Sequence, residues 1–271
     1  MAGTTTRSII PATAMWNDVN ENRFRPKLMR GLLSALGFAG ILWPSLALPT
    51  FRLEGPARGL SAQILNHDRF GAGALKDALT QIESELPLLY VAPDILRAGA
   101  LAARRVSEEA LGGSDPGEQD HQLEAVSARV RSALLLNPAD SFLWLELYSD
   151  DIARNGFSLS SASYLNQSYI TGPREGWIAL RRNRLALAAF PLIGETLQER
   201  IVLEFSGLVD GNFLQQAIIN LTTVGWNERY RLLASVERVD IQSRETFARR
   251  LMQDGVKLNV PGVEIDERPW R

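Results

Sequence analysis

The alternation of apolar and polar positions divides this chain into one uncharged stretch followed by a long series of amphipathic segments. Residues 31–51 lie between Arg30 and Arg52 and contain no charged side chain. A helix of this length, at about 1.5 Å per residue, extends about 30 Å, which is the thickness of the hydrocarbon core of a bilayer. The pattern therefore predicts a single transmembrane helix over residues 31–51.

Two other interpretations of the apolar stretch compete with a retained anchor. A cleaved signal peptide would use the small-residue site Ser45-Leu46-Ala47, and a buried helix of a soluble core would also be apolar. The 30-residue leader and the length of the apolar run favour retention over cleavage. Pro44 and Pro49 favour a membrane segment that ends at an interface over a regular core helix.

Charge before the apolar stretch predicts the orientation of the chain. Residues 1–30 carry Arg7, Arg23, Arg25, Lys27 and Arg30 against two acidic residues. By the positive-inside rule, this excess keeps the N-terminus in the cytoplasm and sends the remainder across the membrane. The predicted location is the inner membrane of a Gram-negative cell, with a single span and a periplasmic C-terminal domain. Residues 1–30 are expected to be a disordered tail, and residues 52–59 a linker.

From residue 60 to 255 the start and stop signals in the sequence are those of helices. Asp94 is a suitable N-cap, Pro116 suits a first helical position, and Asn137-Pro138 and Asn155-Gly156 are stop signals. We expect helices at 61–65, 74–86, 95–111, 116–136, 141–154, 158–171, 173–190, 196–209, 213–224, 228–239 and 244–254. Strand signals are confined to residues 256–271, which are expected to form an extended C-terminal tail. The predicted class is all-α.

Two stretches of this region are similar to each other. Pro138 and Pro173 are 35 residues apart, and Trp144 and Trp177 are 33 apart. This spacing resembles the tetratricopeptide repeat family, whose period is about 34 residues. The positions that match the family pattern are Asn137-Pro138, Trp144, Leu147, Gly156, Ala162 and Leu165.

The resemblance covers residues 133–180 and implies a degenerate array of helical hairpins. A single hairpin cannot bury its apolar stripe, so neighbouring hairpins must stack, with large side chains filling the seams between them. The resemblance assigns this structural role to Trp144, Leu147, Leu165 and Trp177.

The residues available for chemistry argue against an enzyme. The chain has no cysteine, which excludes disulfides, thiol nucleophiles and thiolate metal sites, and its only histidines are His67 and His121. Glu146 and Asp150 are i,i+4 neighbours that could share a proton or bind a cation, although a salt-bridged face is the commoner arrangement. The chain carries no phosphate-binding loop or nucleotide fingerprint. No catalytic residue, cofactor or metal is therefore predicted, and the acidic excess after residue 30 predicts no nucleic-acid partner.

The most suggestive polar feature is a group of cations after Pro173. The predicted binding residues are Arg174, Arg181, Arg182 and Arg184. In arrays of the resembled family the first helix of each pair lines a concave groove, where arginines could hold carboxylates or an anionic polymer. The alternative is that these arginines lie on the surface and pair with nearby acids such as Glu175.

Taken together, these patterns predict a membrane-anchored, non-enzymatic scaffold that binds a protein partner. Proteins of this architecture resemble accessory factors of envelope assembly, including polysaccharide polymerisation and export. The alternative is a direct binder or processing enzyme of an anionic envelope polymer that uses the arginine-rich helix. A third interpretation is a membrane organiser that forms homo-oligomers through a small-residue stripe of Gly31, Ala35 and Ala39.

Overall fold

A computed structural model of the chain describes residues 17–66, 68–71, 73–84, 91–110 and 116–264. At residues 17–27, 45–51, 110, 116, 118 and 119 the description covers the backbone alone. Every regular element in the described residues is a helix, which confirms the all-α class. The α-helices are α1 Asn17–Leu65, α2 Ala74–Ser84, α3 Pro93–Ala110, α4 Pro116–Leu136, α5 Ser141–Asn155, α6 Leu159–Thr171, α7 Gly176–Ala188, α8 Glu195–Asp210, α9 Leu214–Thr222, α10 Arg229–Val236 and α11 Ile241–Gln253. Two short 3₁₀ helices, η1 Phe190–Leu192 and η2 Trp226–Glu228, lie between them.

The best predicted helices are those with strong caps. The Asp140 carboxylate accepts hydrogen bonds from the backbone N–H groups of Phe142 and Leu143 and so starts α5. Gly156 ends α5 with a φ of 74°, a conformation that glycine adopts at little cost. Ser158 then starts α6 through a capping box with Ser161. These local signals explain why α5 and α6 begin and end close to the predicted positions.

Helix α7 begins later than the position of Pro173 predicts. Its first residue is Gly176, and residues 172–175 form a turn instead. A Cβ atom at Gly172 would overlap the side chain of Ser141, so this turn lies directly against the start of α5. Tertiary packing at Gly172 therefore sets the start of α7. The position of Pro173 in the sequence could not predict this contact with α5.

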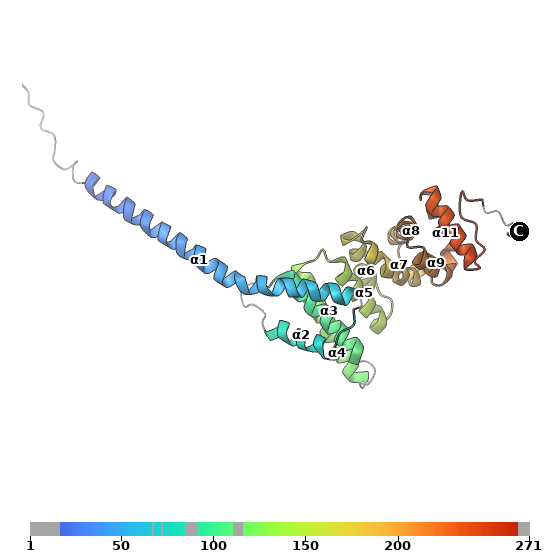
Figure 1. Cartoon of the computed structure of the whole chain (residues 1–271), viewed down its shortest axis with the longest axis horizontal. Coiled ribbons are helices and arrows are strands. Elements are labelled where there is room, and N and C mark those ends of the chain that lie inside the picture. The colour runs from blue at the N-terminus through green and yellow to red at the C-terminus, as the bar shows by residue number, and fades with distance from the viewer. Residues whose placement is uncertain (1–16, 67, 72, 85–90, 111–115, 265–271) are drawn as a thin grey trace, which may run out of the picture.

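The helices form consecutive antiparallel hairpins that stack side by side: α3 with α4, α5 with α6, α7 with α8 and α9 with α10, followed by α11 (Figure 1). A series of hydrogen bonds joins residues 33–37 positions apart along the chain. The pairs are Ser141–Glu175, Tyr148–Leu185, Tyr169–Glu204, Asn183–Asn220, Gln198–Arg231, Val202–Ser235 and Gln215–Arg250. Each bond connects a helix to the corresponding helix of the next hairpin. The architecture is thus helical-repeat-like well beyond residues 133–180.

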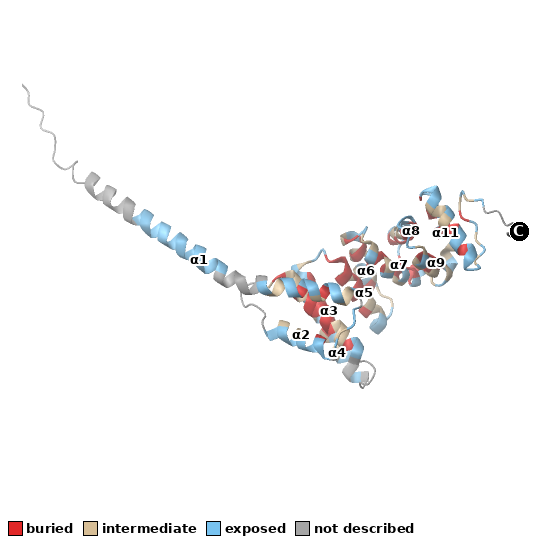
Figure 2. Cartoon of the chain, viewed as in Figure 1, coloured by how far each residue is buried: buried red, intermediate tan, exposed pale blue. Residues whose placement is uncertain are grey.

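The core runs through the stacked hairpins, as Figure 2 shows by the buried residues along α3 to α9. Leu147 and Leu165 are fully buried in it, in agreement with their predicted place in a seam. Trp144 is half-buried, stacks on Tyr164 with ring centroids 6.1 Å apart, and donates its indole N–H to Pro138 O at 2.8 Å. Trp177 differs, since 44% of it is exposed and its ring leans on Phe142.

Helix α1 is one continuous element that includes residues 52–59, where the sequence predicts a linker. Its C-terminal part packs on α3, with Ala57 buried against Ile95 and Ala98. Arg58 bridges Glu54 on its own helix and Asp94 at the start of α3. This burial outweighs the poor helix propensity of a segment that contains glycine and proline. The residues from Asn17 to position 30, predicted as part of a disordered tail, also belong to α1.

The N-terminal part of α1 projects away from the hairpins (Figure 1). Residues 28–44 are all exposed, and their large apolar side chains, among them Leu33, Leu36, Phe38 and Trp43, are 46–76% exposed (Figure 2). Within the part of the chain that the structure describes, no helix contains an apolar stretch long enough to cross a membrane. The predicted span continues to residue 51, and the side chains of residues 45–51 lie outside the described set.

The C-terminal segment is irregular, and no strand is found in its described residues, 254–264. Val260 is nevertheless fully buried, and Arg244 of α11 donates to Pro261 O at 2.8 Å. The first part of the predicted extended tail therefore packs on α11. Its remaining residues, 265–271, lie outside the described ranges.

Candidate functional site

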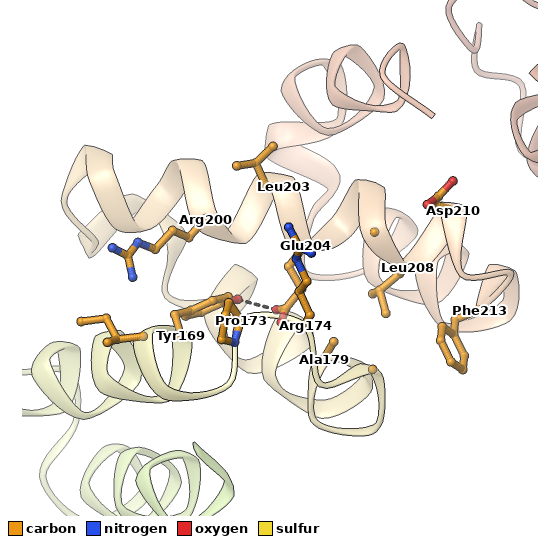
Figure 3. Close-up of a pocket in the computed structure, with 13 residues that line it drawn as sticks. Tyr169, Pro173, Arg174, Ala179, Arg200, Leu203, Glu204, Leu208, Asp210 and Phe213 are labelled. Atoms are coloured by element: carbon orange, nitrogen blue, oxygen red, sulfur yellow. Dashed lines mark hydrogen bonds between the residues drawn. The ribbon is translucent and has the colours of Figure 1, made fainter. Parts of the chain in front are cut away.

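A cleft lies between α6 and α8, with the start of α7 as its floor (Figure 3). Its volume is about 890 Å³, within the range of about 300–1,000 Å³ that is typical of ligand pockets. The residues that line it are Tyr169, Ile170, Pro173, Arg174, Gly176, Ala179, Arg200, Leu203, Glu204, Gly207, Leu208, Asp210 and Phe213. We call it the α6–α8 cleft.

A buried ion pair supports the floor of this cleft. The Arg182 guanidinium, 0% exposed, donates from Nε and Nη2 to Glu204 Oε1 at 2.9 and 2.6 Å. Its other hydrogen bonds go to the carbonyl and hydroxyl oxygens of Ser168 and to the carbonyl of Gly172. The guanidinium also lies 4.1 Å from the centroid of the Tyr169 ring. Arg182 thus ties α7 to both α6 and α8.

Glu204 and Tyr169 complete this network at the surface of the cleft. The Tyr169 hydroxyl donates to Glu204 Oε2 at 2.5 Å, the contact drawn in Figure 3. Burial raises the pKa of Glu204 above its ordinary value, although Arg182 opposes the shift. Burial and the neighbouring Glu204 carboxylate raise the pKa of the Tyr169 hydroxyl well above its ordinary value. The floor is therefore a fixed, hydrogen-bonded surface.

The walls of the cleft combine cations with apolar side chains. Arg174 comes from the turn before α7, and Arg200 from the first half of α8. Over the residues that the structure describes, neither guanidinium forms an ion pair. Ile170, Leu203 and Phe213 are 40–51% exposed beside them. Such a surface can bind a ligand that has both an acidic group and an apolar group.

Arg181 lies in a different groove, on the face formed by α3, α5 and α7. Its Nη1 atom is 2.8 Å from Glu146 Oε1, and Arg104 of α3 approaches both Glu146 and Asp150. The two carboxylates therefore form the salt-bridged arrangement that the sequence favoured, not a free acid pair. This groove, about 460 Å³, also holds Ile64 at the C-terminal end of α1.

The four arginines predicted as one binding group thus occupy four different surroundings. Arg174 lines the α6–α8 cleft, Arg181 pairs in the second groove, and Arg182 is fully buried. Arg184 is exposed, and no ion pair involves it within the described ranges. The expectation of an accessible Arg182 is corrected by its burial. Helical geometry separates these neighbours, because successive residues point about 100° apart around the axis.

Sequence reasoning did not identify Tyr169, Arg200 or Glu204 as parts of a site. Tyr169 and Glu204 are 35 residues apart, so extending the repeat period beyond residue 180 would have paired them. Arg200 has no local signal, because its relation to Arg174 exists only once α8 packs beside α6. His121 is exposed, His67 lies outside the described residues, and the described residues contain no cluster that could hold a metal ion.

Comparison with known proteins found no matching family model, no matching curated protein and no matching solved structure.

Proposed function

We propose that this chain is a membrane-anchored, non-enzymatic scaffold that holds a protein partner, with α1 as its anchor and a tetratricopeptide-like array as its binding body. The N-terminus would lie in the cytoplasm and the array in the periplasm, next to the inner membrane. Envelope assembly, including polysaccharide export, is the setting that we propose by analogy of architecture.

The observation that carries the proposal is the exposed apolar surface of α1. Residues 28–44 place large apolar side chains all around the part of α1 that projects away from the array (Figures 1 and 2). A continuous apolar surface of this kind is unfavourable in water and favourable in a bilayer. The opposite end of α1 is fixed on α3 by Arg58 and Ala57. An anchored α1 would hold the array at a defined position relative to the membrane.

The distribution of the arginines favours a protein partner over an anionic polymer. A polymer-binding surface needs several cations along one continuous path. Here Arg181 already pairs with Glu146, and Arg182 is committed to Glu204 inside the fold. The remaining unpaired cations at the α6–α8 cleft stand beside exposed Leu203 and Phe213. Mixed cationic and apolar surfaces are typical of protein interfaces.

Membrane extraction and topology reporters test the anchor. We expect the full chain to resist carbonate extraction, and a reporter that is active only in the cytoplasm to be silent when fused after Arg271. A variant with Leu33, Leu36 and Phe38 replaced by Asn should be released from the membrane while its array keeps its helical content. Release of the unaltered chain by carbonate, or an active C-terminal reporter, would contradict the proposal.

Photocrosslinking tests the partner. A photoreactive amino acid at Leu203, 46% exposed at the edge of the cleft, should form an adduct with a protein of the membrane fraction. The matched control is the same amino acid at Leu159, which is 89% exposed and does not line the cleft. Identical adduct patterns at the two positions would mean that the cleft does not hold the partner. Crosslinking of single-cysteine variants at Ala35 would show separately whether two α1 helices associate through the small-residue stripe.

A further inference from the structure

We infer that the α6–α8 cleft binds a short peptide segment of the partner that carries an acidic residue at one end, apolar residues in the middle and a basic residue at the other end. This inference rests on the proposed scaffold function and specifies the chemistry of its ligand.

The order of charges along α8 fixes the order in the ligand. Arg200, Leu203, Gly207 and Asp210 all line the cleft, at spacings of three or four residues that place them on one face of the helix. Figure 3 shows Arg200 at one end of the cleft and Asp210 at the other. The cleft is therefore cationic at one end and acidic at the other, and a ligand with the opposite order is favoured.

The two cations and the acid that line the cleft are available for a ligand. Arg174 adds a second positive charge to the wall that faces α8, and among the described residues neither it nor Arg200 has a carboxylate partner. Asp210 is exposed and likewise forms no ion pair within those residues. The floor cannot supply these partners, because the Glu204 carboxylate already accepts hydrogen bonds from Arg182 and Tyr169. A bound segment would supply charged partners to Arg174, Arg200 and Asp210.

A glycine in the last turn of α8 leaves open space on the surface of the cleft. Gly207 is exposed, lies three residues before the end of the helix, and would meet no atom within 4 Å if it carried a Cβ. Glycine is unfavourable inside a helix, and no close packing contact in the fold requires one here. On the cleft surface it provides space beside Leu203 and Leu208. An apolar side chain of the ligand would enter this space.

The distance between the charged ends limits the length of the segment. Arg200 and Asp210 are ten residues apart on α8, which corresponds to roughly 15 Å at about 1.5 Å per residue. An extended peptide rises about 3.3 Å per residue, so roughly five residues reach from one end to the other. The ligand is thus a segment of about five residues, such as a linear stretch of a partner protein near the membrane.

Reversible disulfide capture can detect such a weak ligand, because the chain has no cysteine of its own. Full-length chain in detergent would carry a single cysteine at Ile170, on the edge of the cleft, and would equilibrate with thiol-bearing blocked peptides. The probes are Glu-Leu-Ala-Leu-Lys, its reverse Lys-Leu-Ala-Leu-Glu, and the same residues with both charges in the centre. Intact-mass spectrometry measures the captured fraction, and a cysteine at Leu159 provides the control site.

At Ile170→Cys we expect one of the two end-charged peptides to be captured about fivefold better than the centre-charged one, since two or three exposed ion pairs each contribute a factor of about two. Combining Arg200→Glu with Asp210→Lys should transfer the preference to the other end-charged peptide. Gly207→Leu should abolish the preference by filling the space beside Leu203 and Leu208, with unchanged helical content. At Leu159→Cys the three peptides should be captured to the same extent.

Equal capture of all peptides at Ile170→Cys, or a preference unaffected by the double charge reversal, would overturn the inference. Its failure is distinguishable from failure of the scaffold proposal. If a partner crosslinks at Leu203 but no peptide is preferred, the scaffold proposal is supported and the inference of a ligand with this charge order is refuted. If one peptide is clearly preferred but the chain does not attach to the membrane, the inference about the cleft is supported and the proposed membrane anchor is refuted.

Discussion

Breaking the buried pair between Arg182 and Glu204 should strongly destabilise the array. In Arg182→Met the Gly172 carbonyl loses its Nη2–H donor, at a cost of about 1–2 kcal/mol for an unsatisfied buried group. The Ser168 carbonyl keeps the backbone N–H of Gly172 as a donor. Glu204, whose side chain is 5% exposed, keeps only the Tyr169 hydroxyl among these donors. An uncompensated buried carboxylate brings the expected loss to about 3–5 kcal/mol.

The matched variants separate charge pairing from loss of volume. Glu204→Leu leaves the guanidinium buried without the two hydrogen bonds that it donates to Glu204 and should also cost about 3–5 kcal/mol. The double variant Arg182→Met with Glu204→Leu removes both charges and fills the same space with apolar groups. It should be more stable than either single variant by about 1–3 kcal/mol, because only the Gly172 carbonyl and the Tyr169 hydroxyl then lack partners.

Equilibrium unfolding in urea, followed by far-ultraviolet circular dichroism, measures these differences on the full chain in a mild detergent. Arg184→Met on the same helix is the control, because Arg184 is exposed and should change the free energy of unfolding by no more than about 0.5 kcal/mol. A loss below about 1 kcal/mol in Arg182→Met would refute the reasoning. So would a double variant whose loss equals the sum of the two single losses, since that result means that the pair is not coupled.

Four further predictions follow from the same contacts. Trp144→Ala should cost about 2–3 kcal/mol in urea unfolding, less than for a fully buried aromatic residue because Trp144 is half-buried. Arg181→Glu should lower the melting temperature by placing a second carboxylate beside buried Glu146, whereas Arg184→Glu should leave it nearly unchanged. Gly207→Ala should raise the stability by about 0.5–1 kcal/mol, since its Cβ meets open space and alanine favours the helix. Thermal melts across pH should show the wild type losing stability relative to Glu204→Gln as the pH rises above 4.5, because a raised folded-state pKa stabilises the fold only while the carboxyl is protonated.

Each of these has a clear contrary result. Unchanged stability in Trp144→Ala would place the indole outside the seam between hairpins. Equal effects of the Arg181 and Arg184 reversals would contradict the pairing of Arg181 in the second groove. A destabilised Gly207→Ala would mean that the surface of α8 at Gly207 is closely packed. A wild type that gains stability relative to Glu204→Gln as the pH rises would mean that the folded-state pKa of Glu204 is lowered and not raised.

The helical class and many helix boundaries could be predicted from the sequence alone. Asp140, Gly156 and Ser158 act through hydrogen bonds and backbone conformations that involve only their near neighbours. Signals of this kind are complete within a few residues, so they can be recognised in the printed chain. The seam residues Leu147 and Leu165 were identified from the resemblance to the tetratricopeptide pattern, and both are buried in the core.

The candidate site depended on contacts between hairpins. The sequence grouped Arg174, Arg181, Arg182 and Arg184 because they are neighbours in the chain, yet one is buried, one is paired and one lines the cleft. Residues that do act together, such as Tyr169 and Glu204, lie one repeat apart. Such residues come together because corresponding helices of successive hairpins pack against each other. Their spacing is hard to recognise in the sequence because the repeat is degenerate.

The same distinction applies to α1 and to the start of α7. That residues 31–51 form an uncharged apolar stretch follows from the sequence alone, because this property needs no partner in the fold. The continuation of α1 through residues 52–59, where a linker was expected, and the start of α7 at Gly176 become apparent only in the tertiary structure. In both cases a close contact, of Ala57 with α3 or of Gly172 with Ser141, outweighs the local preference. Burial and steric exclusion act between residues far apart in the chain, and a local pattern contains no record of them.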